Sequence, residues 1–282
     1  MLPTVERLYR TATKVQAIPG LHYLVPPPNV VASDDTKAGF LECQRLAQEA
    51  VKEVASCIRP GWTELQTADL IETYLRDQGV PQFFHKPYVW FGDRSRFDGI
   101  GGYAAFMPTA RVLREAEPFI LDVAPILKGF ISDIGYSDCL GENKEFEKAV
   151  GFLKELRQEI PTLFVSGRTG GEICREIESR IEGAGYENRH RCYPFGVIGH
   201  RVHRVTPTSV TAHFLNFGWQ SFWSLLSRGL LGQLFNGMTE GDLTGLWAIE
   251  PHIGAKGFGA KFEEILVVEN GMASWLEGEG CY

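Results

Sequence analysis

The sequence lacks the features that mark several familiar classes of protein. Its six cysteines are scattered without a C-x-x-C pair, which argues against a structural zinc site and a disulfide framework. Met1 is followed by neither a basic segment nor the apolar core of a signal peptide. No uninterrupted apolar run is long enough to cross a bilayer. These absences predict a cytoplasmic protein with reduced thiols.

Positive charge is also scarce. Lys and Arg number 28 against 35 Asp and Glu, and the formal net charge is −7. Because no basic stripe with interleaved aromatic residues is present, neither nucleic acid nor an anionic membrane surface is expected as a partner. The 282 residues, 44% of them hydrophobic, are enough to bury a substantial core.

The chain is predicted to divide into an arm and one domain. Residues 1–35 include the tract P26-P-P-N-V-V-A-S-D-D35, whose prolines resist regular structure and favour an extended arm. Residues 36–282 form the domain. It opens with a predicted helix over 36–58, followed by a second helix that starts at a capping box of Thr63 and Gln66.

The same order of elements returns about a hundred residues later. A helix is predicted over 145–158, ending before Pro161, and another starts at a capping box of Thr169 and Glu172. Each helical pair is followed by glycine and then by a β-rich segment. This repetition indicates a pseudo-twofold α+β domain with four helices outside a curved sheet, although two unrelated helical hairpins would give the same pattern.

Two aspartates interrupt apolar, β-rich runs. Asp122 lies in the predicted strand 119–123, and Asp133 lies near the end of a second predicted strand, 130–134, after a Lys-Gly turn. Antiparallel pairing would bring both carboxylates together in a poorly solvated interior, which is costly unless a cation lies between them. One paired aspartate and one turn aspartate is the alternative interpretation.

Two glutamates occupy comparable places further along the chain. Glu250 ends the apolar run 246–250, and Glu263 lies at the head of a β-branched run. Four acids at the edges of apolar strands point to one oxygen-rich site for one or two divalent ions, with Mn, Fe, Co or Zn favoured over Mg. Independent placement of the four acids is the alternative.

The stretch L121-D122-V-A-P and its continuation K-G129-F-I-S-D133-I resemble the metal-binding hairpin of the M24 peptidases. Glu250-Pro251 and Glu263-Glu264 match the later pattern of that family, so the resemblance covers about residues 36–282. It implies the pita-bread fold, which is α+β and pseudo-twofold with a curved antiparallel sheet. It also implies Asp122, Asp133, Glu250 and Glu263 as metal ligands.

The histidine segment departs from the family pattern. In P194-F-G196-V-I-G199-H200-R-V-H203, an ungapped alignment puts His203 on the substrate-contacting histidine and Gly196 on the ligand position. A three-residue deletion instead puts His200 on the ligand position. We take His200 as a predicted ligand and His203 as a predicted catalytic residue, and the choice between His200 and Gly196 stays open.

Other predicted substrate contacts come from less regular segments. Arg204 replaces the acid that usually follows the second histidine, while His85 and Asp98 lie near the place of an upstream catalytic histidine. Trp219 and Trp223 belong to an aromatic segment with helical spacing, within residues 214–236. That segment is interpreted as a core helix or dimer contact, or alternatively as a wall over the metal site.

The resemblance implies hydrolysis of a small peptide or amide, Xaa-Pro bonds included, by a metal-activated water. Glu250 would shuttle a proton, and His203 would donate a hydrogen bond to the carbonyl group. The family also implies a homodimer and a small-molecule or short-peptide substrate. Two alternatives remain: a C–N hydrolase or lyase acting on a small, partly apolar metabolite, and a catalytically silent binding module.

Overall fold

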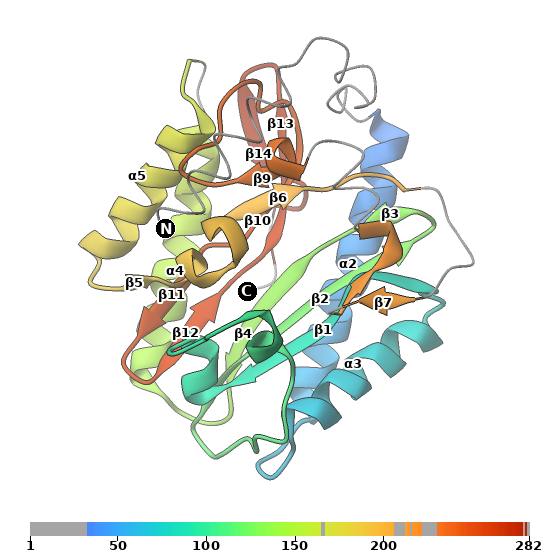
Figure 1. The fold of residues 1–282 in the computed structure, drawn as a ribbon, viewed down its shortest axis with the longest axis vertical. Coiled ribbons are helices and arrows are strands. Elements are labelled where there is room, and N and C mark those ends of the chain that lie inside the picture. The colour runs from blue at the N-terminus through green and yellow to red at the C-terminus, as the bar shows by residue number, and fades with distance from the viewer. Residues whose placement is uncertain are drawn as a thin grey trace.

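Two pairs of helices flank antiparallel strands in the computed structural model, which describes residues 33–164, 167–205, 212–214, 216–221, 230–278 and 280 (Figure 1). The helices in this part are α2 (Asp34–Cys57), α3 (Glu64–Asp77), α4 (Lys144–Leu163) and α5 (Gly170–Gly183). None of them combines the length and the apolar character that crossing a membrane requires. Residues 1–32 of the predicted arm lie outside the described residues.

The second helix of each pair begins at a capping box, as predicted. The hydroxyl of Thr63 accepts from the N–H of Gln66, whose side chain accepts from the Thr63 N–H in return. Thr169 and Glu172 make the same reciprocal bonds at the start of α5. These bonds satisfy backbone donors that the first turn of a helix leaves unpaired.

Helix α4 differs from its prediction because it continues through Pro161 to Leu163. A proline has no N–H for the carbonyl four residues earlier, here that of Arg157. The indole Nε1 of Trp275 donates to that carbonyl at 2.8 Å. A tertiary contact therefore supplies the hydrogen bond that the helix itself cannot make.

The first sheet contains six strands: β1 (Gln82–Phe91), β2 (Pro118–Leu127), β3 (Phe130–Ile131), β4 (Ile134–Cys139), β7 (His213–Phe214) and β8 (Phe217–Gly218). Lys128 and Gly129 have positive φ and form the tight turn between β2 and β3. The predicted strand 119–123 is longer than expected. The predicted strand 130–134 is broken at Ser132 and Asp133, so Asp133 lies in a gap between two paired segments.

Two further sheets follow in the second half of the chain. One has the order β14–β13–β10–β6–β9, with bounds β6 (Gly199–Arg201), β9 (Leu234–Phe235), β10 (Gly245–Ile249), β13 (Glu264–Glu269) and β14 (Met272–Trp275). The other consists of β5 (Glu187–Asn188), β11 (His252–Ala255) and β12 (Phe258–Lys261). An isolated bridge between Gly135 and Glu263 joins the two halves at the centre of the molecule.

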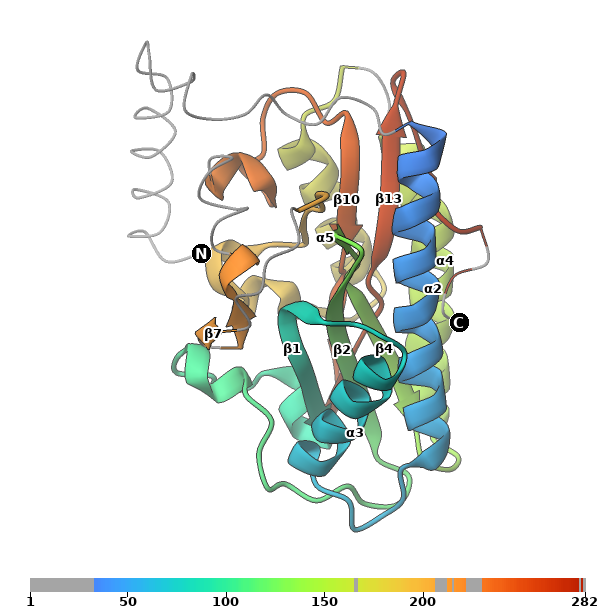
Figure 2. The ribbon, with the colours of Figure 1, turned by 90° about the vertical axis from the view of Figure 1, so that its right-hand side faces the viewer.

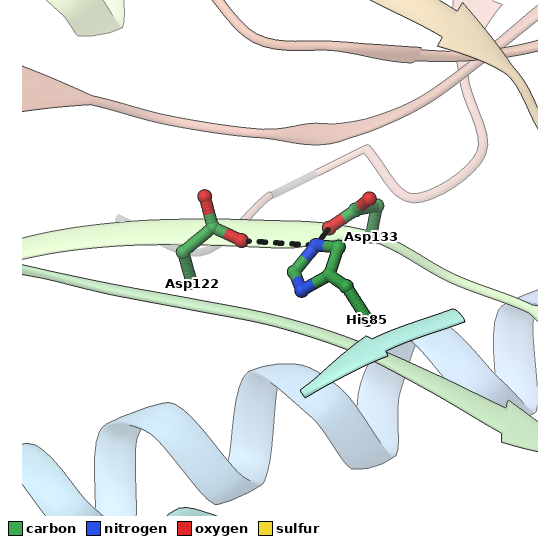
Figure 3. Close-up of side chains that lie close together, drawn as sticks. All are labelled: His85, Asp122 and Asp133. Carbon is green, nitrogen blue, oxygen red and sulfur yellow. Dashed lines mark hydrogen bonds and ion pairs between the residues drawn. The ribbon is translucent and has the colours of Figure 1, made fainter. Parts of the chain in front are cut away.

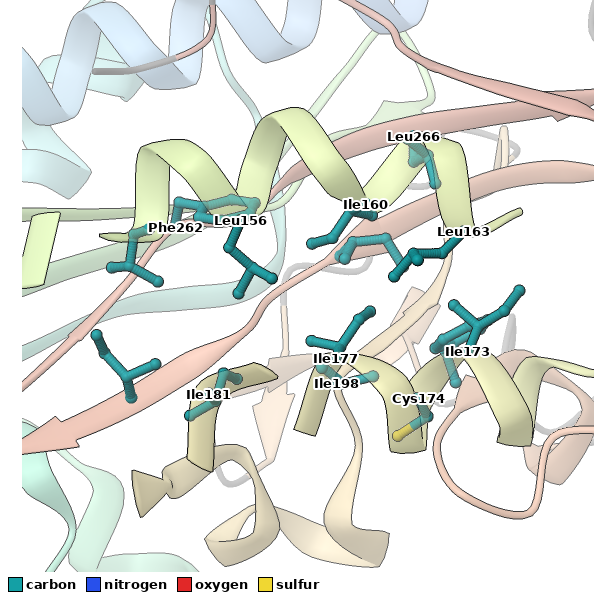
Figure 4. Packing of buried hydrophobic residues seen from close by; sticks show 14 of the residues in the cluster. Leu156, Ile160, Leu163, Ile173, Cys174, Ile177, Ile181, Ile198, Phe262 and Leu266 are labelled. Carbon is teal, nitrogen blue, oxygen red and sulfur yellow. The ribbon is translucent and has the colours of Figure 1, made fainter. Parts of the chain in front are cut away.

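In the described part of the chain, α2 and α3 pack against strands of the first sheet, and α4 and α5 pack against strands of the second half. Figure 2 shows α2 and α4 on the same side. The inner faces of α4 and α5 pack with strand residues into an apolar cluster that includes Ile160, Ile177 and Leu266 (Figure 4). Each such side chain contributes about 1.5–3 kcal/mol when fully buried. The short helices are η2 (Gly92–Arg96), η3 (Tyr103–Phe106), η4 (Arg189–Cys192), η5 (Pro194–Gly196) and η6 (Leu230–Gln233).

Candidate active site

The four predicted acids meet at the junction of the two halves. Asp122 lies in the middle of β2, where it pairs with Tyr88 of β1 and Gly135 of β4. Asp133 occupies the gap between β3 and β4, Glu250 directly follows β10, and Glu263 directly precedes β13. All four side chains are buried, and their carboxylate oxygens fall within the same small clusters.

Two histidines complete the group of acids. The Nε2 atom of His85 lies 3.1 Å from Oδ1 of Asp133 and 3.3 Å from Oδ1 of Asp122. Figure 3 shows both carboxylates directed at this nitrogen from opposite sides. The Nε2 atom of His200 lies 3.0 Å from Oδ2 of Asp133 and 3.8 Å from Oε1 of Glu263. Asp133 therefore stands between two imidazoles.

Backbone contacts determine which ring nitrogen of each histidine carries the proton. Nδ1 of His85 lies 2.9 Å from the carbonyl oxygen of Lys86, and Nδ1 of His200 lies 3.1 Å from that of Arg201. A carbonyl only accepts, so each Nδ1 carries hydrogen. In the neutral tautomer each Nε2 then presents a lone pair to carboxylate oxygens. Because the lone pair and the carboxylate oxygens repel each other, a proton or a metal ion must lie between them. This tautomer is the one that metal-binding histidines adopt.

The protonation of the cluster follows from these contacts. Burial on its own lowers the pKa of His85, but the charge and hydrogen bond of Asp133, with the charge of Asp122, outweigh it and raise the pKa to about 9. Burial would raise the pKa of Asp133, but the two histidines hold it well below its usual value. Without a metal ion, His85 is therefore an imidazolium at neutral pH.

A lysine that the sequence analysis did not select lies among the acids. Lys261, the last residue of β12, is fully buried. Its Nζ donates to Oδ2 of Asp122 at 2.7 Å, and to Oε2 of both Glu250 and Glu263 at 2.8 Å. Burial lowers the pKa of this ammonium, but the three carboxylates together raise it well above its ordinary value. Lys261 therefore supplies part of the positive charge that the four acids need, and their role as metal ligands stays a prediction.

The remaining donors fit a divalent ion. Nε2 of His85 and His200, both oxygens of Asp133 and Oε1 of Glu263 are not engaged by the lysine. Oδ1 of Asp122 is buried and has no hydrogen-bond partner within the described residues, although His85 lies nearby. Mixed imidazole and carboxylate donors suit Mn, Fe, Co or Zn.

A pocket of about 310 Å³ opens above this cluster. Its floor includes the four acids, His85 and His200, and its wall is mainly aromatic, with contributions from Tyr88, Trp90, Tyr103, Phe106, Tyr193 and Phe217. The hydroxyl groups of Tyr88 and Tyr103 share a hydrogen bond. Among the described residues that line the pocket there is no Arg or Lys.

Several residues predicted as substrate contacts lie elsewhere. Asp98 is largely exposed and pairs with Arg96 and Arg189. Arg204 is exposed, with its guanidinium against the ring of Phe130. Neither side chain lines the pocket, because local ion-pair and ring contacts hold each one at the surface.

Four further predictions concern the second half of the chain. His203 is buried beside β6, and its Nε2 bonds to Oε1 of Gln233 rather than to the acids. Trp219 is 56% exposed and is not part of the pocket wall. Trp223 lies outside the described residues. Gly196 ends η5 without lining the pocket, whereas His200 does line it.

Sequence reasoning missed Lys261 and the aromatic wall. Lys261 and Glu263 are two positions apart next to a strand, and a period of two is the signal that places side chains on one face. The aromatic residues come from segments far apart in the chain. His85 was predicted as a substrate contact, and the structure brings it into the cluster itself.

Comparisons of the sequence with known proteins identify relatives of this chain. A sequence model of metallopeptidase family M24 matches residues 38–270. The methionine aminopeptidase of Archaeoglobus fulgidus is 25% identical over 154 residues, which make up 55% of this chain and 50% of that protein. The chain thus spans about half the length of this curated relative.

Solved structures show the same fold. The prolidase from Pyrococcus furiosus has a TM-score of 0.67 and 16% identity, over 88% of this chain and 65% of that one. The X-Pro aminopeptidase from Thermotoga maritima has a TM-score of 0.66 and 18% identity, over 87% and 62%. The methionine aminopeptidase from Rickettsia prowazekii has a TM-score of 0.61 and 15% identity, over 88% and 98%.

The predicted pita-bread fold is confirmed by these likenesses. The four acids at the junction, helices α3 to α5 and the strands from β1 to β13 lie within the segment that the family match covers. Because that match extends over residues 38–270, well over half of the sequence, the chain belongs to metallopeptidase family M24.

Proposed function

We propose that this chain is a metal-dependent hydrolase that cleaves a small peptide or amide beside an apolar group. The observation that carries the proposal is the buried cluster of imidazoles and carboxylates at the floor of an aromatic pocket. His85, Asp133, His200 and Glu263 would hold the ion. A divalent ion bound there supplies a water of lowered pKa and polarises a carbonyl oxygen.

Glu250 is the residue to which we assign proton transfer. Its side chain lines the pocket, and its Oε2 accepts from Lys261 at 2.8 Å. The lysine fixes the orientation of the carboxylate and leaves Oε1 to take a proton from the attacking water. The same oxygen can return that proton to the leaving nitrogen, as general acid–base catalysis requires.

Tyr88 and Tyr103 are assigned the hydrogen-bonding role that the sequence suggested for His203. Their hydroxyl groups bond to each other at the pocket wall. One proton is used between the two oxygens, so the second hydroxyl proton remains for the carbonyl oxygen of the substrate. The pair therefore offers a fixed donor where negative charge develops.

The pocket wall favours an apolar substrate group without negative charge. A proline ring is apolar, and the names of two structural relatives, X-Pro aminopeptidase and prolidase, refer to bonds involving proline. Since the described lining contains no Arg or Lys, a substrate carboxylate would have no cationic partner there. We therefore expect amidated or longer Xaa-Pro peptides to be better substrates than free Xaa-Pro dipeptides.

The same wall supports a second candidate, a C–N hydrolase or lyase acting on a small apolar metabolite that is not a peptide. What favours it is an aromatic lining whose described residues include no Arg or Lys for the terminal carboxylate of a peptide. The two candidates share the metal cluster and differ in the group bound above it.

The test is to load the purified chain with Mn, Fe, Co or Zn and to follow the cleavage of matched substrates. An Xaa-Pro amide, the free Xaa-Pro dipeptide and a Met-Ala peptide separate the specificities, with Glu250→Gln as the control for proton transfer. Cleavage that prefers the amide and is lost in Glu250→Gln supports the proposal. If no peptide is cleaved with any of the four ions, peptidase activity is excluded, and turnover of small apolar amides then decides for the second candidate.

A further inference from the structure

Lys261 occupies a position that a metal ion would otherwise need. Its Nζ donates to one oxygen each of Asp122, Glu250 and Glu263 at 2.7–2.8 Å. These three acids form one of the three groups of described side chains that could hold a divalent ion. An ion bound to the same oxygens would lie against the ammonium, and the two cations would repel each other in a poorly solvated interior.

The surroundings of Lys261 are shaped to hold its side chain at this place. Its backbone is fixed on both sides by Ser137, whose Oγ accepts from the Lys261 N–H at 2.8 Å and donates to its carbonyl oxygen at 2.7 Å. A Cβ at position 135 would lie 2.4 Å from Cε of the lysine, so Gly135 leaves the room that the lysine stem uses. The Tyr193 ring lies 5.4 Å from Nζ and adds a cation–π contact.

The other part of the cluster contains no ammonium of a described residue. There, Nε2 of His85 and of His200 both face Asp133, with Nδ1 of each ring held by a backbone carbonyl. Oε1 of Glu263 faces the same space, while its Oε2 belongs to the lysine. The buried Oδ1 of Asp122, which accepts no hydrogen bond from a described residue, also faces His85.

We propose that the centre binds a single divalent ion between His85, Asp133, His200 and Glu263, and that the ammonium of Lys261 permanently fills the second cation position. This deepens the metal-dependent function proposed above and assigns His85 as a ligand. The lysine balances the charge of Asp122 and Glu250 and holds Glu250 in place. One exchangeable ion and one fixed cation then share a site that has room for two cations.

The direct test needs no variant. The metal-free protein is titrated with Mn²⁺, and bound metal is counted by elemental analysis after removal of free ion, together with the electron paramagnetic resonance spectrum. One Mn²⁺ per chain with the six-line spectrum of an isolated ion is expected. Two ions per chain with an exchange-coupled spectrum would overturn the proposal, and so would no bound ion at saturating Mn²⁺, Fe²⁺, Co²⁺ or Zn²⁺.

Substitution of Lys261 tests the second cation position. Lys261→Met keeps the apolar stem but ends one atom earlier and removes the ammonium, so the number of bound Mn²⁺ ions should rise from one to two. Lys128→Met is the matched control, because Lys128 is exposed and pairs only at the surface with Glu42. A folded Lys261→Met protein, verified by circular dichroism, that still binds one ion contradicts the assignment; if this variant does not fold, the wild-type count decides.

His85→Ala should weaken Mn²⁺ binding at least tenfold, as the removal of a ligand implies, and unchanged affinity would exclude His85 as a ligand. Peptide turnover separates this inference from the proposed function. One bound ion without cleavage of any peptide or amide contradicts the function and leaves the inference standing. Two bound ions together with cleavage of a peptide support the proposed function and contradict the inference.

Discussion

The stem of Lys261 packs directly against Gly135 at the junction of the two halves. A Cβ at Gly135 would lie 2.4 Å from Cε of Lys261 and 3.1 Å from Cβ of Glu263. Gly135 pairs with Asp122 in the first sheet and bridges to Glu263 in the second half. The absence of one side chain thus makes room for the cation among the acids.

Gly135→Ala should therefore destabilise the protein by about 1–3 kcal/mol, because added volume in a packed interior forces neighbouring atoms to move. Chemical denaturation measures the change in unfolding free energy. Gly151→Ala is the control, since Gly151 lies in α4 and a Cβ added there would meet nothing within 4 Å. In a Lys261→Ala background the cost of Gly135→Ala should fall, and an unchanged cost would show that the lysine stem is not the obstacle.

The convergence of the acids could be predicted from the sequence, whereas the position of Lys261 could not. An acid inside or beside an apolar strand is costly, so four such acids imply a shared partner. A lysine in a β-rich run normally faces solvent. Its burial here depends on Gly135 and Ser137, which belong to β4 and lie far away in the sequence.

Local sequence patterns also do not predict the break in the strand at Asp133 or the aromatic pocket. The β-rich run predicts one strand over residues 130–134, but the bridge from Gly135 to Glu263 and the pairing of β2 set the real register. Tyr88 and Tyr193 reach the same pocket from different halves of the molecule. Only tertiary pairing brings such residues together, and no single segment encodes it.

Lowering the pH should lower the folding stability of the protein because Glu178 on α5 becomes protonated. Burial would raise the pKa of this carboxyl, but hydrogen bonds and charges from Arg191 and His190 lower it to about 2, from an ordinary value of 4.5. The folded state then binds fewer protons than the unfolded state between these values, so its stability is present above pH 4.5 and is lost as the pH falls towards 2. Urea denaturation between pH 6 and pH 3 measures the unfolding free energy at each pH, and this free energy should fall less with decreasing pH in Glu178→Gln than in the unaltered protein.

Glu155→Gln is the control for the loss of one carboxylate, because Glu155 lies exposed on α4. If Glu178→Gln and Glu155→Gln gave the same pH dependence as the unaltered protein, the ion pairs of Glu178 would not contribute to acid stability.

The indole of Trp275 should stabilise the end of α4 because it replaces the hydrogen bond that Pro161 cannot donate to Arg157. Trp275→Phe should cost about 1 kcal/mol for this bond, in addition to lost packing. In a Pro161→Ala background the new N–H can bond to the Arg157 carbonyl, so the cost of Trp275→Phe should be smaller. A double-mutant cycle of unfolding free energies isolates this difference, and strictly additive effects would refute the compensation.

With Tyr103 as the member of the pair that donates to the substrate carbonyl, Tyr103→Phe should lower kcat about 100-fold with little change in KM, as removal of one preorganised donor to a developing oxyanion does. Burial raises the pKa of Tyr103 and of Tyr88, so both phenols keep their protons at neutral pH. Tyr136→Phe is the control, because its hydroxyl donates to Asp138 at 3.1 Å and is not part of the pocket. Steady-state kinetics on the best amide substrate measures both constants. A rise in KM at constant kcat would instead mean that Tyr103 only shapes the apolar wall, because an interaction equally strong in substrate and transition state changes binding alone.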